Sequence, residues 1–212
     1  MKNNTYLIKI IILSFIVFTG CIFNDDDDCC NDNNKTVTGE GPLVTHVVNL
    51  PAFHNISNTG VMHLEVTKGS EQKVTIQAQD NIFEVLTFEV KNGTLTISTE
   101  DNVNVNTDKG LYGDLVITQS CESINLVGTG NITLHGEKQN TLNINVVGTG
   151  NVKAFDQEVD NCVINSTGTG NCEVWVNQNL SVTLTGIGSV YYKGNPSISQ
   201  SIIGLGKIVD SN

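Results

Sequence analysis

The chain has 212 residues and a formal net charge of −11 at pH 7, with 22 acidic residues against 11 lysines and no arginine. This composition excludes nucleic acid as a partner, because phosphate backbones are bound by basic patches. It also disfavours peripheral docking on anionic lipid, and the length suits one domain behind an N-terminal leader.

Residues 1–20 have the pattern of a bacterial lipoprotein signal peptide. Two lysines supply a positive start, and the apolar run over residues 10–18 is too short to span a bilayer. The junction Phe-Thr-Gly-Cys, which ends at Cys21, resembles a lipobox, although phenylalanine stands where leucine is usual. We therefore predict that Cys21 is lipidated and anchors an outer-membrane lipoprotein. A signal anchor and ordinary cleavage nearby are the alternatives.

Residues 21–35 form an acidic segment with four consecutive aspartates, which repel each other and predict an extended tether. An acidic run close to a lipidated cysteine also resembles the surface-export signal of Bacteroidetes lipoproteins, so both a periplasmic and a surface-exposed location stay open. The run lacks the glycine turn and terminal glutamate of an EF-hand loop. No cysteine or histidine spacing indicates zinc, so we expect no metal and no cofactor.

The first half of the domain reads as short strands without a helical stripe. An Asn-Gly pair at residues 92–93 predicts a hairpin, which allows this half to depart from a purely parallel coil. The β-rich runs lie at residues 47–53, 62–66, 73–78, 86–90 and 94–98.

Residues 124–176 carry an internal repeat with a period of 20 residues. Gly-Thr-Gly-Asn occurs three times, and two weaker Gly-x-Gly copies follow at a period of 18. A single coil of this size cannot cover its own apolar face, so the repeat predicts stacked coils. The repeated positions are Gly128, Gly130 and Asn131, then Gly148, Gly150 and Asn151, then Gly168, Gly170 and Asn171, with the weaker copies at Gly186 and Gly204.

Apolar and polar residues alternate on both sides of each glycine pair, which predicts a strand, a corner and a second strand. Glycine supplies the positive φ that a sharp corner needs, and asparagine tolerates it. Successive asparagines should then stack about 4.8 Å apart. We predict an all-β domain over residues 36–212, built as a parallel β-solenoid. An antiparallel meander or sandwich is the alternative.

Two sets of side chains stand out within the coils. Cys162 and Cys172 fall at inward positions, either as small core residues or as a disulfide in an oxidising compartment. His135, Phe155 and Trp175 share the seventh position after the first glycine and should form an outward column. Such a column is a candidate ligand-binding face, or else it is covered by a loop or a subunit interface.

The pattern from about residue 45 onward resembles the putative auto-transporter adhesin, head GIN domain family. The resemblance rests on Leu-Pro-Ala-Phe at 50–53, the alternation over 61–66, Asn-Gly-Thr-Leu-Thr-Ile at 92–97, Leu-Val-Ile at 115–117 and the Gly-x-Gly coils. It implies a β-solenoid exported to the envelope of Bacteroidetes-like bacteria, often as a lipoprotein. It supplies no catalytic residues.

A non-enzymatic binding module of the envelope or cell surface, such as an adhesin, fits these features best. Its partners would be glycans or envelope or host proteins. A structural envelope protein that forms homo-oligomers is the alternative, because open solenoid ends favour self-association unless they are capped. A polysaccharide-active enzyme is disfavoured, because the coil carboxylates Asp156, Glu158, Asp160 and Glu173 do not form the pair that glycosidases need.

Overall fold

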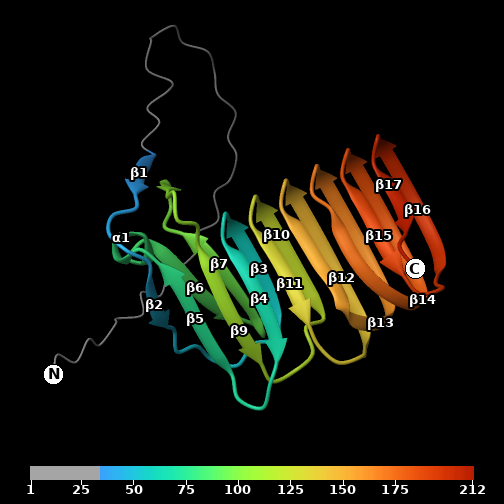
Figure 1. Ribbon diagram of the computed structural model, residues 1–212, viewed down its shortest axis with the longest axis horizontal. Helices are drawn as coiled ribbons and strands as arrows, with labels where there is room; N and C mark the ends of the chain where they lie inside the picture. Colours follow the sequence, from blue (N-terminus) through green and yellow to red (C-terminus); the bar gives the residue numbers. More distant parts are fainter. Residues whose placement is uncertain (1–33) are drawn as a thin grey trace, which may run out of the picture. The chain divides into compact units, whose positions relative to one another are not determined.

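The computed structural model describes residues 34–212, so the predicted leader and nearly all of the predicted tether, Cys21 included, lie outside the described residues. The described chain consists of strands and one four-residue helix (Figure 1), and the prediction of an all-β domain is confirmed. The first half contains β1 (Lys35–Thr38), β2 (Val44–Val47), β3 (Asn55–Gly60), β4 (His63–Lys68), β5 (Lys73–Ala78), α1 (Asp80–Phe83), β6 (Leu86–Lys91), β7 (Thr94–Thr99), β8 (Val103–Asn106) and β9 (Tyr112–Ile117). The second half contains β10 (Ser123–Gly128), β11 (Asn131–His135), β12 (Gln139–Gly148), β13 (Asn151–Gly168), β14 (Cys172–Gly186), β15 (Ser189–Lys193), β16 (Ser197–Gly204) and β17 (Lys207–Asp210).

One mixed sheet of 15 strands holds every described strand except β1 and β8, which pair with each other. The sheet curls into two walls that enclose one hydrophobic core. Wall A runs through β6, β7, β3, β10, β12, the second halves of β13 and β14, and β16. Wall B runs through β2, β5, β9, β4, β11, the first halves of β13 and β14, β15 and β17.

From β10 onward the strands of each wall pair in parallel, and the sequence repeat sets their register. On wall A, Ile124 pairs with Ile144, and Ile144 pairs with Ile164. On wall B, Val152 pairs with Cys172. All of these side chains are buried. Residues one period apart therefore stack directly on each other, and the inward positions of the alternation form the core.

The domain as a whole is a curled mixed sheet, so the prediction of one parallel solenoid over residues 36–212 needs correction. β6 and β7 pair antiparallel through the turn at Asn92 and Gly93, where φ is 51° and 74°. β5 pairs antiparallel with both β2 and β9. A two-residue turn with positive φ joins antiparallel neighbours, so turn chemistry overrides parallel stacking at β6 and β7. The antiparallel pairs of β5 join segments that are distant in sequence.

The glycine corners bring backbone against backbone. Gly128, Gly148 and Gly168 have φ of 122°, 122° and 131°. A Cβ on Gly148 would collide with the carbonyl oxygen of Gly128. That oxygen instead accepts hydrogen bonds from the N–H groups of Thr149 and Gly150, at 2.9 and 3.1 Å. Glycine is therefore required at these corners both for its φ and for the space it leaves.

The asparagines after each corner connect successive coils. The side-chain amide of Asn151 donates to Oδ1 of Asn131 at 2.8 Å. The backbone N–H of Asn171 donates to Oδ1 of Asn151 at 3.0 Å. Each side chain thus satisfies polar groups of the adjacent coil, which supports the stack at half-buried positions.

A further corner, at Gly60, lies between β3 and β4. Asn-Thr-Gly at residues 58–60 marks a turn there, but it lies outside the Gly-x-Gly repeat. Gly60 has φ of 133°, pairs with Gly128, and its carbonyl oxygen accepts from the N–H of Thr129 at 2.9 Å. Met62 occupies the position that a second glycine holds in later copies. The buried side chain of Asn58 donates to the carbonyl oxygen of Met62 at 2.8 Å, which holds this corner in place.

Replacing Gly148 with alanine should destabilise the domain, because the new Cβ meets the Gly128 carbonyl at a backbone conformation that is strained for L residues. We expect a loss of about 3 kcal/mol in the free energy of unfolding. Gly41 is the matched control, since its φ of 80° is positive but nothing lies within 4 Å of a Cβ placed there. Gly41→Ala should cost about 1 kcal/mol. Urea unfolding followed by tryptophan fluorescence compares them, and equal losses would contradict the packing role.

Candidate binding face

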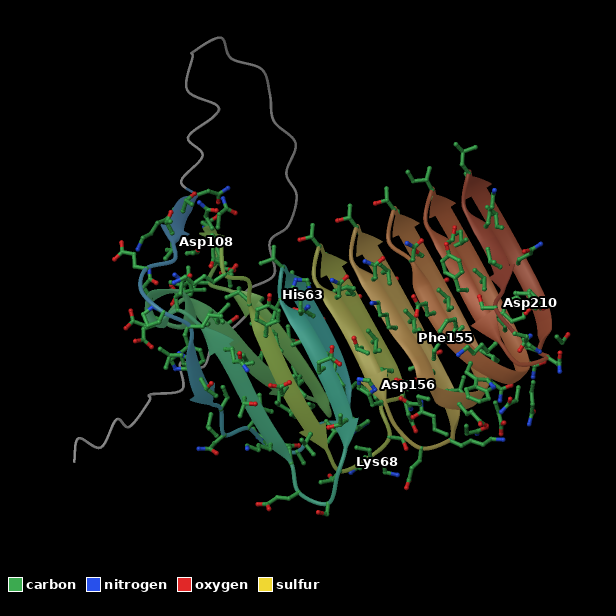
Figure 2. All side chains as sticks on the ribbon, in the orientation of Figure 1. His63, Lys68, Asp108, Phe155, Asp156 and Asp210 are labelled. Carbon is green, nitrogen blue, oxygen red and sulfur yellow. The ribbon has the colours of Figure 1, made fainter. Side chains whose placement is uncertain are left out.

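The outer surface of wall B gathers the aromatic and charged side chains of the coils, and we call it the binding face (Figure 2). It is formed by outward residues of β9, β4, β11, β13, β14 and β15, which point away from the core because alternate residues of a strand share a face. Figure 2 shows the labelled residues His63, Phe155 and Asp156 along this part of the domain. The outward residues of wall A from β10 to β16, by contrast, are all Asn, Ser, Thr, Val or Ile.

A groove of about 530 Å³ crosses the binding face at β5, β9, β4, β11 and β13. Tyr112 forms an aromatic platform there, with 44% of its surface exposed, and its ring stacks on His63 with centroids 5.6 Å apart. Nδ1 of His63 lies 2.9 Å from the side-chain amide nitrogen of Asn131, which fixes the imidazole. The polar lining includes Glu65, Gln77, Asp114, Asn131, Thr133 and Lys153.

Strand register brings these groove residues together from distant parts of the chain. His63 pairs with Tyr112, and Glu65 pairs with Asp114, across β4 and β9. Thr133 pairs with Glu65 on one side and with Lys153 on the other. Neither Asp114 nor Lys153 joins any ion pair among the described residues. The groove therefore offers a carboxylate, an ammonium group and an aromatic ring that are free to meet a ligand.

The predicted outward column lies beside the groove, and the structure brings two of its three members together. Phe155 and Trp175 are partly exposed beneath Lys193, whose Nζ lies 4.4 and 5.9 Å from their ring centroids. An ammonium group at these distances is attracted to an aromatic face. Phe155, Trp175 and Lys193 thus form a second aromatic and cationic patch on the binding face.

His135, the third member of the column, is engaged by carboxylates instead of by the aromatic rings. Its Nε2 lies 2.9 Å from Glu65 and its Nδ1 lies 3.1 Å from Asp156. An irregularity in β13 causes the difference, because the register of β11 and β13 shifts and pairs His135 with Asp156. His135 therefore lies between the groove and the aromatic patch. It contacts Glu65, which lines the groove, and Asp156, which follows Phe155 in β13.

Three of the four coil carboxylates considered for hydrolysis have structural partners. Asp156 contacts His135, and Asp160 contacts Nζ of Lys138 at 2.9 Å. The hydrogen bond and charge of Asp160 raise the pKa of the Lys138 ammonium. The side-chain amide of Asn177 donates to Glu158 at 3.3 Å. Within residues 34–212, no group of three or more His, Cys, Asp or Glu side chains is placed to hold a metal ion.

Cys162 and Cys172 are buried free thiols, without the disulfide that the sequence left open. Cys162 pairs with Leu180 in wall A, and Cys172 pairs with Val152 in wall B. Burial raises the pKa of Cys172 to about 12. Burial, together with the nearby Cys172, raises the pKa of Cys162 as well. Both side chains therefore act as small core residues in this structure.

The sequence analysis did not predict the groove, because it singled out neither Tyr112 nor His63. Neither Tyr112 nor His63 belongs to the repeat, so no periodic signal marks them. The alternation over residues 112–117 is the one local signal that could have placed Tyr112 on a strand. Its position beside His63 depends on pairing between separate segments, which that signal does not contain.

Comparison with known proteins identifies the family. The chain matches the family described as putative auto-transporter adhesin, head GIN domain, over residues 52–120 and 112–196, and it belongs to that family. The resemblance indicated by the sequence motifs is confirmed.

Solved structures resemble this chain at low sequence identity, and one of them exceeds a TM-score of 0.5. A putative adhesin from Bacteroides fragilis NCTC 9343 is 20% identical, with a TM-score of 0.52, over 82% of this chain and 100% of that one. A putative lipid binding protein from Parabacteroides distasonis ATCC 8503 is also 20% identical, with a TM-score of 0.49, over 84% of this chain and 100% of that one. The comparison with curated proteins finds no match.

Across the part of the chain that the structure describes, no helix has the length and apolar character to cross a membrane.

The three described cysteines should resist alkylation in the native protein. Burial disfavours the thiolate and raises the pKa of Cys121, like that of Cys172, to about 12, so little nucleophile exists at pH 8. Iodoacetamide treatment and peptide mass spectrometry should find Cys121, Cys162 and Cys172 unlabelled when folded and labelled in urea. A Cys162–Cys172 peptide that stays blocked in urea until a reductant is added would contradict the free thiols.

The same burial predicts a loss of stability at alkaline pH. The folded thiols keep their protons up to about pH 12, whereas unfolded thiols lose theirs above about pH 8.5. Between these values the unfolded state binds fewer protons, so the free energy of unfolding should fall as pH rises. Urea unfolding at pH 7, 9 and 10 measures the trend. Replacing the three cysteines with alanine should flatten it.

Proposed function

We propose that the protein is a non-catalytic binding module of the bacterial cell envelope, which acts in adhesion by holding a glycan on the binding face. The observation that carries this proposal is the groove with the Tyr112 and His63 rings on one side and the unpaired Asp114 and Lys153 among its polar groups. Membership of a family described as adhesin heads supports the adhesive role. The stacked rungs of β10 to β17 would serve as a short, rigid solenoid that presents this face.

The chemistry of the groove suits a sugar. A sugar ring has an apolar face that packs on an aromatic side chain, and hydroxyl groups that exchange hydrogen bonds with carboxylate, amide, hydroxyl and ammonium groups. Tyr112 supplies the platform, while Asp114, Thr133 and Lys153 supply acceptors and donors. The formal charge of −11 opposes an acidic glycan. A neutral or amino sugar is therefore the expected ligand class.

Glycan-array binding of the lipid-free protein, residues 22–212, tests this function. Tyr112→Ala should weaken binding to a positive glycan by about tenfold, because loss of an aromatic contact costs about 1.4 kcal/mol. Val147→Ala is the matched control, since Val147 has a similar exposed fraction of 41% but lies on wall A. Phe155→Ala and Trp175→Ala test whether the aromatic patch extends the same site. Binding that survives all three aromatic substitutions in folded protein would refute the binding face.

We also propose that Cys21 carries the lipid that anchors this module in the outer membrane, with residues 22–35 as its tether. This proposal is supported by the apolar run and the Gly-Cys junction of the sequence. Several acyl chains on one cysteine suffice for stable anchoring.

Metabolic labelling with an alkynyl fatty acid tests the anchor. The wild-type protein should be labelled and recovered with outer membranes, whereas Cys21→Ser should lose the label and leave the membrane fraction. Cys121→Ser is the control that should keep both. Labelling of Cys21→Ser would contradict the anchor, and protease treatment of intact cells would distinguish a surface from a periplasmic location.

A further inference from the structure

The C-terminal end of the stack leaves both walls with an unpaired strand edge. Among the described strands, β16 bonds only to β14, and β17 bonds only to β15 (Figure 1). Every residue of β16 is exposed, whereas the residues of β14 that pair with its inward positions are buried. A long, uncharged edge strand of this kind is a template for pairing with another strand.

Exposed aliphatic side chains concentrate at this end. Of the ten large hydrophobic residues that are exposed within residues 34–212, five lie between 187 and 205. Ile203 and Leu205 have exposed fractions of 68% and 79%. Ile198 and Ile202 occupy inward positions that would belong to the core if another rung followed. We call β16, β17 and the corner residue Leu205 between them the end rung.

The opposite end of the stack protects its edges. Phe83 of α1 stacks on His46 of β2 with ring centroids 3.8 Å apart, and it also lies 5.9 Å from Phe88 of β6. The Phe83 side chain therefore covers the end of the core between β2 of wall B and β6 of wall A. Glu89 and Lys91 place charges on the edge strand β6. Charges and a covering helix are the usual protection of strand edges, and β16 has neither charge nor helix.

Charge also separates the end rung from the rest of the molecule. Residues 174–209 contain no aspartate or glutamate and two lysines, in a chain of net charge −11. Two copies of such a chain repel each other over most of their surface. Within the end rung, β16 and the corner at Leu205 carry no carboxylate, and Asp210 stands at the end of β17. Two copies can therefore approach along β16 without opposed carboxylates.

We propose that the end rung joins two copies of this chain end to end. A single extended peptide can pair with only one wall, but a second copy offers two strand edges on one rung. Rungs of this chain already pack on each other here, since Leu180 pairs with Ile198 and Leu184 with Ile202. A two-fold axis makes the contact isologous, with β16 antiparallel to its partner copy.

The sequence of β16 is complementary to itself in this arrangement. Antiparallel pairing keeps both inward faces together only if residues of the same parity oppose each other. Centred on Gln200, this register places Ile198 opposite Ile202 of the second copy, and Gln200 opposite Gln200. The two amides can each donate and accept one hydrogen bond. This accounts for a glutamine in the inward column that Ile144, Ile164 and Val182 occupy in other rungs.

Sedimentation equilibrium of the lipid-free protein, residues 22–212, tests the contact. The wild-type protein should form a dimer in a concentration-dependent manner. Ile202→Lys should raise the dissociation constant at least about tenfold, because burying an ammonium group costs more than 1.4 kcal/mol. Val163→Lys is the matched control, since Val163 is similarly exposed but points outward in the middle of wall A. It should leave the dimer intact.

Gln200 provides a second pair of variants that barely change the shape of the side chain. Gln200→Glu should dissociate the dimer because two carboxylates would meet across the axis, whereas Gln200→Leu should keep it. Circular dichroism and thermal unfolding confirm that each variant folds.

Three outcomes would overturn the proposal. The wild-type protein could remain a monomer up to about 100 μM, which would leave no interface of useful affinity. The dimer could persist in both Ile202→Lys and Gln200→Glu, or Val163→Lys could break it as strongly as Ile202→Lys does. Tyr112→Ala should keep the dimer, so loss of glycan binding and loss of the dimer are separate results.

Discussion

The close approach of backbones at the glycine corners is the constraint on which the rest of the fold depends. Each corner carbonyl accepts hydrogen bonds from the next coil, as Gly128 does from Thr149, and no side chain fits between them. A corner repeated at a constant period holds every strand of a wall in the same register. Because a slip of one residue would turn all inward side chains outward, the corners also decide which residues form the core.

This division of residues leaves recognition to the outward faces, which differ between the walls. Wall A presents a ladder of amides and hydroxyls that bond mainly to one another, as when Asn145 donates to Asn125 at 2.6 Å. Wall B combines strands of the repeat with β4 and β9, which contribute His63, Glu65, Tyr112 and Asp114. The groove exists because the irregular first half joins the regular second half along this wall.

The two ends of the stack differ in how their strand edges and core are covered. At the N-terminal end, the antiparallel strands and α1 close the core with Phe83. At the C-terminal end, the inward column continues to Ile198, Gln200 and Ile202, which no described strand covers. The first half therefore does more than extend the sheet, because its departure from the parallel pattern provides a cap.

Local pattern in the sequence was sufficient to predict the all-β class, the corners from Gly128 to Gly204, the inward positions and the family. Alternation and glycine spacing are visible along one continuous stretch of chain, so they predict strands and corners without knowledge of which strands pair. The Asn-Gly pair at residues 92–93 also predicted the antiparallel hairpin of β6 and β7. Only the tertiary structure decided that Met62 completes a corner with Gly60, that β5 runs antiparallel to β2 and β9, and that Tyr112 lies on His63. It also decided that His135 leaves the aromatic column, because one irregularity in β13 changes its partner to Asp156. These features depend on which distant segments pair and in which register. The pairing and the register are set by the free energy of the whole sheet, which no local pattern contains.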